Sequence, residues 1–113
     1  MRHCLALDLK DDPESIARYE AHHVRIWPEI AAHLRVHGVR VMEIYRLGTR
    51  LAMWMETDDA SFDADRFAAA TRDTPAVREW EALMDTFQTP TPWTPAGEKW
   101  TPMHRIFDLA RQP

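Results

Sequence analysis

Four segments of the chain have the hydrophobic pattern of β-strands, with alternating or largely apolar residues. The first is HCLALDLK, residues 3–10, and the last is MHRIFDLA, residues 103–110. The runs VRVMEIYRL, residues 39–47, and RLAMWME, residues 50–56, are separated only by a glycine and a threonine. Because such a short connection joins neighbouring antiparallel strands, we expect these two runs to form a hairpin.

Between the first strand and the hairpin, apolar and aromatic residues recur at spacings of three and four, the period of an amphipathic helix. Asp12 and Pro13 supply an N-cap and a first helical residue, and Gly38 should end the segment. Pro28 lies inside it, where it lacks an amide hydrogen and crowds an earlier carbonyl, so the helix should kink or break between His23 and Pro28. A kink would open space beside His23. The alternative is that Pro28 only begins a second helix, with nothing functional at the joint.

Two more helices are predicted after the hairpin. The first covers residues 60–73, and Thr74-Pro75 begins the second, on which Val77, Trp80, Met84 and Phe87 share one face. The segment from 88 to 102 contains four prolines and two tryptophans and is predicted to be an irregular loop.

The predicted order is strand, helix, strand, strand, helices, strand, which is the split β-α-β pattern of a ferredoxin-like α+β domain. We expect residues 1–113 to form a single such domain. Helices would cover one face of its sheet, and the chain supplies nothing to cover the other. A homodimer that closes two sheets into an α/β barrel would solve this problem.

Composition and charge narrow the classes of partner. The formal charge is −4 and the basic residues are scattered, so neither nucleic acid nor a membrane surface is an expected partner. Cys4 is the single cysteine, which rules out an intrachain disulfide and favours a reduced compartment. Because no segment resembles a signal peptide or a membrane span, we expect a cytoplasmic protein.

One column of side chains on the first helix suggests a catalytic site. Tyr19, His23 and Trp27 are successive i, i+4 neighbours on the apolar stripe, whereas His22 lies about 100° away around the helix. A lone histidine in such a place is more often a satisfied core residue than a catalyst. Between two aromatic rings, however, burial would lower the pKa of His23, so that its imidazole could both give and take protons.

The chain contains five tryptophans, of which Trp93 and Trp100 lie in the proline-rich loop with Gly97, Glu98 and Lys99. Aromatic faces beside hydrogen-bonding groups suit a sugar, which has an apolar C–H face and a polar rim. Core or dimer packing is the ordinary role of most tryptophans.

A metal site and a nucleotide site are not expected. Glu29, His33 and His37 have the i, i+4, i+8 spacing that could hold a metal on one helical face. No fourth ligand lies at a spacing typical of a metal site. The two histidines are explained by their place near the end of the helix, where they interact with the helix dipole and with solvent. The sequence has no glycine-rich phosphate loop, nucleophile elbow or CxxC motif.

The chain resembles the L-rhamnose mutarotase family over nearly its whole length. The most specific element is Tyr-x3-His-x3-Trp-Pro-Glu, residues 19–29, and weaker elements are His37-Gly38, Ile44-Tyr45 and the REWEALM run from Arg78 to Met84. The resemblance implies a dimeric barrel of ferredoxin-like protomers. It also implies an enzyme that interconverts the α and β anomers of a 6-deoxy-L-sugar without a cofactor.

By position, His23 matches the family's proton-donor histidine, Tyr19 a sugar-contacting tyrosine, and Trp80 the first of two sugar-contacting tryptophans. The sequence departs from the rhamnose enzymes at Met42, where they have a tyrosine, and at Glu81, where they have the second tryptophan. The loop PTPWTPAGEKW also differs from theirs. These differences and the MEIY, EWEALM and GEKW elements are more similar to the branch associated with L-fucose, which we therefore expect as substrate in preference to L-rhamnose.

Mutarotation requires a proton on the ring oxygen and loss of a proton from the anomeric hydroxyl, which are acid and base steps. His23 is the expected acid. A carboxylate or an ordered water would take the anomeric proton, and Glu29, Glu43 and Glu98 are unranked candidates for the carboxylate. The residues expected to bind the sugar are Tyr19, Trp27, Met42, Trp80, Glu81, Trp93, Glu98 and Trp100.

Two other interpretations remain open at this point. Dimeric ferredoxin-like barrels include haem-binding proteins and small oxygenases, so the histidine column could serve that chemistry. A sugar-binding module without catalytic activity is the second alternative, and it predicts that replacing His23 changes neither affinity nor rate.

Overall fold

The computed structural model describes all 113 residues. Its elements, in chain order, are β1 (Arg2–Leu9), α1 (Pro13–Val24), α2 (Pro28–Val36), β2 (Val39–Leu47), β3 (Arg50–Thr57), α3 (Ala64–Asp73), α4 (Pro75–Asp85), β4 (Gln88–Thr89), β5 (Thr101–Pro102) and the 3-10 helix η1 (Leu109–Arg111).

The strands form one antiparallel sheet in the order β2-β3-β1-β4, with β5 also paired to β1. The hairpin strand β3 therefore lies between β2 and β1, which α1 and α2 connect. This split arrangement confirms the predicted ferredoxin-like α+β fold. The predicted hairpin is also confirmed, with Leu47 opposite Arg50 at its end.

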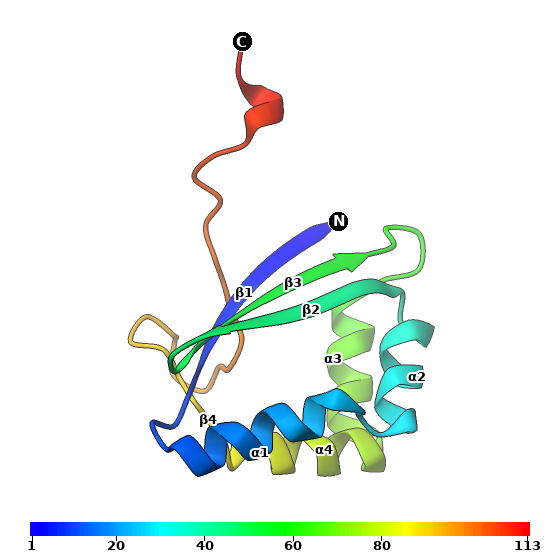
Figure 1. Ribbon diagram of the computed structural model, residues 1–113. Helices are drawn as coiled ribbons and strands as arrows, with labels where there is room; N and C mark the ends of the chain where they lie inside the picture. The colour runs from blue at the N-terminus through cyan, green and yellow to red at the C-terminus, as the bar shows by residue number, and fades with distance from the viewer.

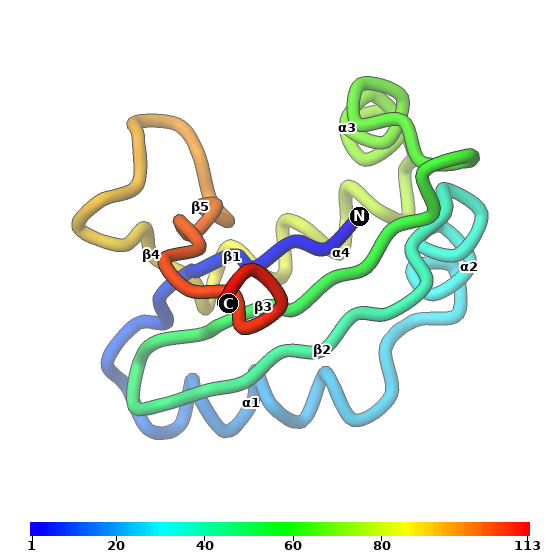
Figure 2. The backbone as a smooth tube through the Cα atoms, turned by 90° about the horizontal axis from the view of Figure 1, so that it is seen from above, coloured from blue at the N-terminus to red at the C-terminus, as the bar shows by residue number.

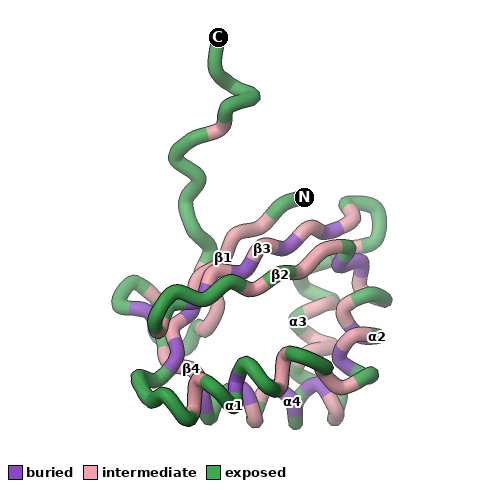
Figure 3. Tube along the Cα trace, in the orientation of Figure 1, coloured by how far each residue is buried: buried purple, intermediate pink, exposed green.

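Helices cover one face of the sheet. α1 and α4 run below the strands, whereas α2 and α3 stand together at one end (Figure 1), and the view from above shows the same division (Figure 2). Buried residues lie along β1, β3, α1 and α4 where these elements face one another (Figure 3). The main core cluster consists of Leu9, Tyr19, Ile30, Leu51, Val77, Trp80, Met84 and Phe87.

Pro28 breaks the long helical segment in two. α1 ends at Val24, Arg25 is extended, and Pro28 occupies the first turn of α2, where its missing amide hydrogen costs nothing. Asp12 caps the start of α1 by accepting a hydrogen bond from the Glu14 amide at 3.2 Å. The predicted break is therefore confirmed.

The predicted strand at residues 103–110 is wrong. Only the Met103 amide continues the ladder, donating to the Cys4 carbonyl at 2.8 Å, and the chain then leaves the body of the molecule (Figure 1). The fourth strand position is instead filled by the short β4 and β5, the two ends of the proline-rich loop. Met103 reaches Cys4, with the two sulfur atoms 3.6 Å apart, but the later apolar residues of the tail are exposed, and Ile106 is 89% exposed.

The predicted helix at residues 60–73 begins later than expected. Asp63 caps α3 by accepting from the Arg66 amide at 2.9 Å, so the helix starts at Ala64. An aspartate at the N-cap satisfies one of the free amides of the first turn. The preceding residues form a turn that connects β3 to α3.

No helix covers the outer face of the sheet (Figure 1), and the tail contacts it at Cys4, whose Sγ lies 3.6 Å from the Sδ of Met103. Cys4 lies opposite Trp54, and Ala6 lies opposite Ala52, on the side away from the core residues of the same strands. Tyr45 on β2 is 60% exposed. This set of residues, Cys4, Ala6, Tyr45, Ala52 and Trp54, is called the outer face below.

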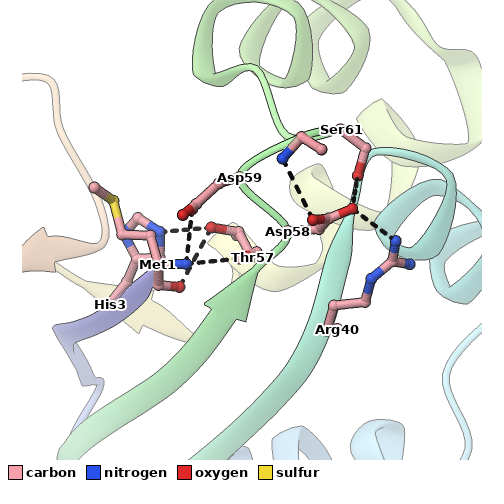
Figure 4. Close-up of polar contacts among 8 residues, drawn as sticks. Met1, His3, Arg40, Thr57, Asp58, Asp59 and Ser61 are labelled. Atoms are coloured by element: carbon pink, nitrogen blue, oxygen red, sulfur yellow. Dashed lines mark hydrogen bonds and ion pairs between the residues drawn. The ribbon is translucent and has the colours of Figure 1, made fainter.

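A polar cluster fixes the connection between β3 and α3 (Figure 4). The Asp58 carboxylate accepts hydrogen bonds from the Ser61 hydroxyl at 2.8 Å, the Ala60 amide at 3.3 Å and the Arg40 guanidinium at 3.0 Å. These bonds, chiefly the one from Ser61, lower the pKa of Asp58. The Asp58 amide also donates to the Gly38 carbonyl at 2.8 Å, so the turn after α2 packs closely against this cluster.

Of two glycines in turns, Gly38 is predicted to be the more sensitive to substitution. Its φ is +91°, and an added Cβ would lie 2.6 Å from the Ser61 hydroxyl and 3.1 Å from the Phe62 amide nitrogen. Gly48, with φ +58°, has open space where a Cβ would stand. We expect Gly38→Ala to lower the free energy of unfolding by about 3 kcal/mol, and Gly48→Ala by about 1 kcal/mol, in urea melts. Equal losses would contradict the close approach at Gly38.

Candidate functional site

The site is a cavity of about 280 Å³ between the sheet and the helices. Fourteen of its 19 lining residues are hydrophobic, and they come from the three long strands, all four helices, the connection between α1 and α2, and the segment before β5. A small apolar cavity with a few polar groups is the usual form of a small-molecule site. The five polar side chains that accompany the Tyr19 hydroxyl are His23, His33, Thr71, Glu81 and Gln88.

His23 lies in the last turn of α1 with its ring between two aromatic rings. The ring centroids are 4.3 Å from Tyr19 and 5.7 Å from Trp80. Nδ1 lies 2.7 Å from the Tyr19 carbonyl oxygen. Since a carbonyl can only accept, Nδ1 carries the hydrogen, and in the neutral ring Nε2 is the nitrogen with the free lone pair. The helix thus fixes the tautomer.

The cavity favours the neutral form of His23. Burial lowers its pKa, the hydrogen bond to the Tyr19 carbonyl opposes this effect in part, and the neighbouring His22 adds to the lowering. Tyr19 is 3% exposed, and burial raises the pKa of its hydroxyl. The site therefore presents an imidazole that can accept a proton beside a phenol that keeps its own.

Gln88 is a site residue that the sequence pattern did not reveal. Its side-chain nitrogen donates to the Tyr19 hydroxyl at 3.3 Å, and its Oε1 is buried without a hydrogen-bond partner. A buried acceptor without a partner is uncommon and costly. Gln88 belongs to the two-residue β4 inside a predicted loop, so no period indicated that its side chain faces the cavity.

His33 and Thr71 form a second polar group on the wall. His33 is 9% exposed, its Nε2 lies 3.2 Å from the Thr71 hydroxyl, and its ring stacks on Phe67. Burial lowers its pKa, as does the nearby His37. The sequence singled out His33 only for its spacing from Glu29 and His37, and the structure contains no group of three side chains able to hold a metal ion.

Some of the predicted sugar-binding residues line the cavity and others lie outside it. Met42, Trp80, Glu81 and Trp100 line the cavity together with Tyr19. Trp27 instead packs edge-on against Trp80, with centroids 5.1 Å apart, and supports the wall from behind.

The other predicted contacts lie outside the cavity. Trp93 is 74% exposed beneath the guanidinium of Arg50, and Glu98 is exposed on the same loop. Among the candidate proton acceptors, Glu43 accepts from the Tyr45 hydroxyl at 3.0 Å, and Glu29 is exposed in the first turn of α2. None of these carboxylates lines the cavity.

Comparison with known proteins decides the family. The sequence model of L-rhamnose mutarotase matches residues 2–109. The chain belongs to the L-rhamnose mutarotase family. It is an isomerase of the mutarotase type, and the resemblance carried by residues 19–29 is confirmed.

The relatives include an L-fucose mutarotase and an L-rhamnose mutarotase. This mutarotase is 43% identical to the L-fucose mutarotase of Xanthomonas campestris pv. campestris, over 96% of this chain and 88% of that protein. It is 29% identical to the L-rhamnose mutarotase of Acidiphilium cryptum, over 93% and 96% of the two chains. The crystal structure of the L-rhamnose mutarotase from Formosa agariphila has the same fold, with a TM-score of 0.69 at 16% identity over 96% of this chain and 98% of that one. No helix of this mutarotase has the length and apolar character to cross a membrane.

The buried imidazoles predict a specific pH response. The pKa values of His23 and His33 are lowered in the folded chain, so the unfolded chain binds more protons as the pH falls below about 6.5. We expect the free energy of unfolding to decrease from pH 7 towards pH 5 through these two side chains. In NMR titrations, the protonation of each of the two rings should have its midpoint at a lower pH in the folded chain than in the same chain in denaturant. Midpoints at or above the denatured values would contradict the burial described here.

Proposed function

We propose that this mutarotase interconverts the α and β anomers of a 6-deoxy-L-hexose, with L-fucose preferred to L-rhamnose, and needs no cofactor. The observation that carries the proposal is the position of His23, whose free Nε2 belongs to a side chain that lines the apolar cavity. The preference for L-fucose is supported by the higher identity to the L-fucose mutarotase, 43% against 29%. Met42 and Glu81 on the cavity wall support it further. The single cysteine supports a cytoplasmic location.

The reaction opens and closes the sugar ring by proton transfer. Neutral His23 takes the proton of the anomeric hydroxyl on Nε2, the anomeric C–O bond to the ring oxygen breaks, and the electron pair of that bond goes to the ring oxygen. The imidazolium then gives its proton to this oxygen, which leaves the open-chain aldehyde. Rotation about the bond to the aldehyde carbon and the reverse steps give the other anomer, with no net change in protons.

This sequence of steps assigns His23 a double role. The sequence analysis assigned His23 the acid step and left the acceptor as a carboxylate or an ordered water. The fixed Nδ1–H and the lowered pKa favour a ring that first accepts and then donates. Tyr19 keeps its proton and can donate a hydrogen bond to the ring oxygen as negative charge develops there.

The walls suit a deoxy sugar. Trp80, Trp100 and Met42 present apolar surface for the C–H face and the 6-methyl group. Glu81 and the unpartnered Oε1 of Gln88 can accept hydrogen bonds from hydroxyls. Sites that hydrogen-bond a hydroxyl discriminate strongly against sugars that place it elsewhere.

We also propose that two copies associate through the outer face. No helix covers this surface, which is apolar apart from Glu43, and the tail after β5 carries Ile106 and Phe107, which are 89% and 64% exposed. Both features lie on the side of the sheet opposite the helices (Figure 1). A second copy related by a two-fold axis would cover the sheet and the tail at once.

The proposed dimer is tested by replacing each of two alanines with arginine. Ala52→Arg places a charge in the middle of the outer face, and Ala68→Arg places the same charge on the exposed side of α3. In size-exclusion chromatography with light scattering, we expect wild type and Ala68→Arg at about twice the 13.2 kDa chain mass and Ala52→Arg at the chain mass. A wild-type monomer would overturn this proposal.

The role of His23 is tested against its neighbour. His23→Gln removes the proton-exchanging nitrogen and should lower the rate of anomer exchange about 100- to 10,000-fold, with the fold retained. His22→Gln changes an adjacent imidazole that does not line the cavity, and its rate should stay within about threefold of wild type. Equal effects of the two substitutions would contradict the assignment.

The proposed reaction is tested by exchange NMR of the anomeric protons of L-fucose, L-rhamnose and D-galactose. Wild type should accelerate exchange most for L-fucose and least for D-galactose, which has a hydroxyl at C6 in place of the methyl group and the opposite configuration at C2 to C5. Acceleration greatest for L-rhamnose would contradict the preference. No acceleration for any of the three would overturn the proposed function and favour a sugar-binding or haem-binding protein.

A further inference from the structure

One wall of the cavity is formed by a segment without regular structure. Residues 90–100, called the cavity loop here, connect β4 to β5 and end in Trp100, which lines the cavity. The loop is braced within itself: the hydroxyls of Thr91 and Thr94 lie 2.7 Å apart, and Thr94 and Thr101 lie 2.8 Å apart. On the outside, Trp93 packs under Arg50 of β3, with the guanidinium carbon 5.2 Å from the ring centre.

On the α4 side, a single cation links the loop to the body. Lys99 Nζ lies 2.8 Å from Glu81 Oε2 and 2.7 Å from Asp85 Oδ1. Glu81 and Asp85 are i, i+4 neighbours on α4, so their carboxylates would repel each other without the ammonium between them. Burial works against the charge on Lys99, and the two carboxylates outweigh it, so that the pKa of Lys99 is raised and the group stays charged.

The link also determines how Glu81 faces the cavity. Lys99 engages Oε2, and Oε1 has no hydrogen bond to any group of the chain. Glu81 lines the cavity and is the one acidic residue that does so. The side chain is 42% exposed, and Lys99 is the cation that pairs with it.

We propose that Lys99 is a positioning residue for sugar selectivity, because it holds Glu81 and Trp100 in place on the cavity wall. The inference rests on the proposed function, and it assigns Lys99 no part in proton transfer. Glu81 Oε1 accepts a hydrogen bond from a sugar hydroxyl, and Trp100 packs on the sugar's apolar face. Selectivity between L-fucose and L-rhamnose, which differ in hydroxyl orientation, then depends on a residue that need not touch either sugar.

The test compares the two lysines of the chain. Lys99→Met keeps the length and apolar stem but removes the charge, Lys99→Arg keeps the charge, and Lys10→Met is the matched control, since Lys10 binds the Thr86 carbonyl outside the cavity. Anomer exchange of L-fucose and L-rhamnose gives kcat and KM for each variant. Hydrogen exchange of the loop amides gives a readout independent of activity.

For Lys99→Met we expect KM for L-fucose to rise at least tenfold, with kcat within about threefold of wild type and an unchanged pH profile of kcat. The ratio of kcat/KM for the two sugars should fall towards one, and the amides of residues 90–100 should exchange faster. Lys99→Arg should restore most of the KM and the ratio, and Lys10→Met should match wild type.

Two results would overturn the inference. An unchanged KM and sugar ratio in Lys99→Met would show that the link does not position the wall. A loss of kcat with a shifted pH profile would make Lys99 part of the proton transfer. If wild type accelerated neither sugar, the proposed function would fail instead, and faster loop exchange in Lys99→Met would still establish that Lys99 anchors the loop.

Discussion

The burial of one imidazole between Tyr19 and Trp80 is the constraint on which the site depends. The His23 ring is fixed from its own helix by the Tyr19 carbonyl, 2.7 Å away, and from α4 by Trp80. The break before Pro28 ends α1 just beyond this ring and turns the chain into α2 at the end of the cavity. A continuous helix could not place His23 and His33 on walls of the same cavity, because residues ten positions apart lie about 15 Å apart along a straight helix.

The sequence predicts the parts of the molecule that follow a local rule. The period of two in β1, the caps at Asp12 and Pro13, and the steric effect of Pro28 act within a few residues, and all are confirmed. The strand at residues 103–110 was wrong because alternation alone does not supply a neighbouring strand or an apolar surface. Gln88 was missed for a related reason: only the pairing of β4 with β1 brings it to the cavity.

In the proposed mechanism, the proton-transfer groups and part of the sugar-binding wall have different structural supports. The imidazole and the phenol lie on α1 and pack against the core, and Trp80 both contacts the imidazole and lines the cavity. The groups that would distinguish one sugar from another are held by the Lys99 ion pairs at a partly exposed edge. We therefore expect a substitution at that edge to change the sugar that fits more than the packing around His23. Such separation is consistent with a family whose relatives bear the names of two different 6-deoxy sugars.

In the proposed mechanism, the cavity holds a neutral imidazole that is ready to accept a proton. The most direct test is kcat/KM for L-fucose anomer exchange, measured by NMR from pH 4.5 to 8 after subtraction of the uncatalysed rate. This mechanism predicts a rate that rises through a midpoint below about pH 6.5 and is constant above it, since only the neutral ring of the free enzyme begins the reaction. A rate that rises as the pH falls through the same range would contradict it.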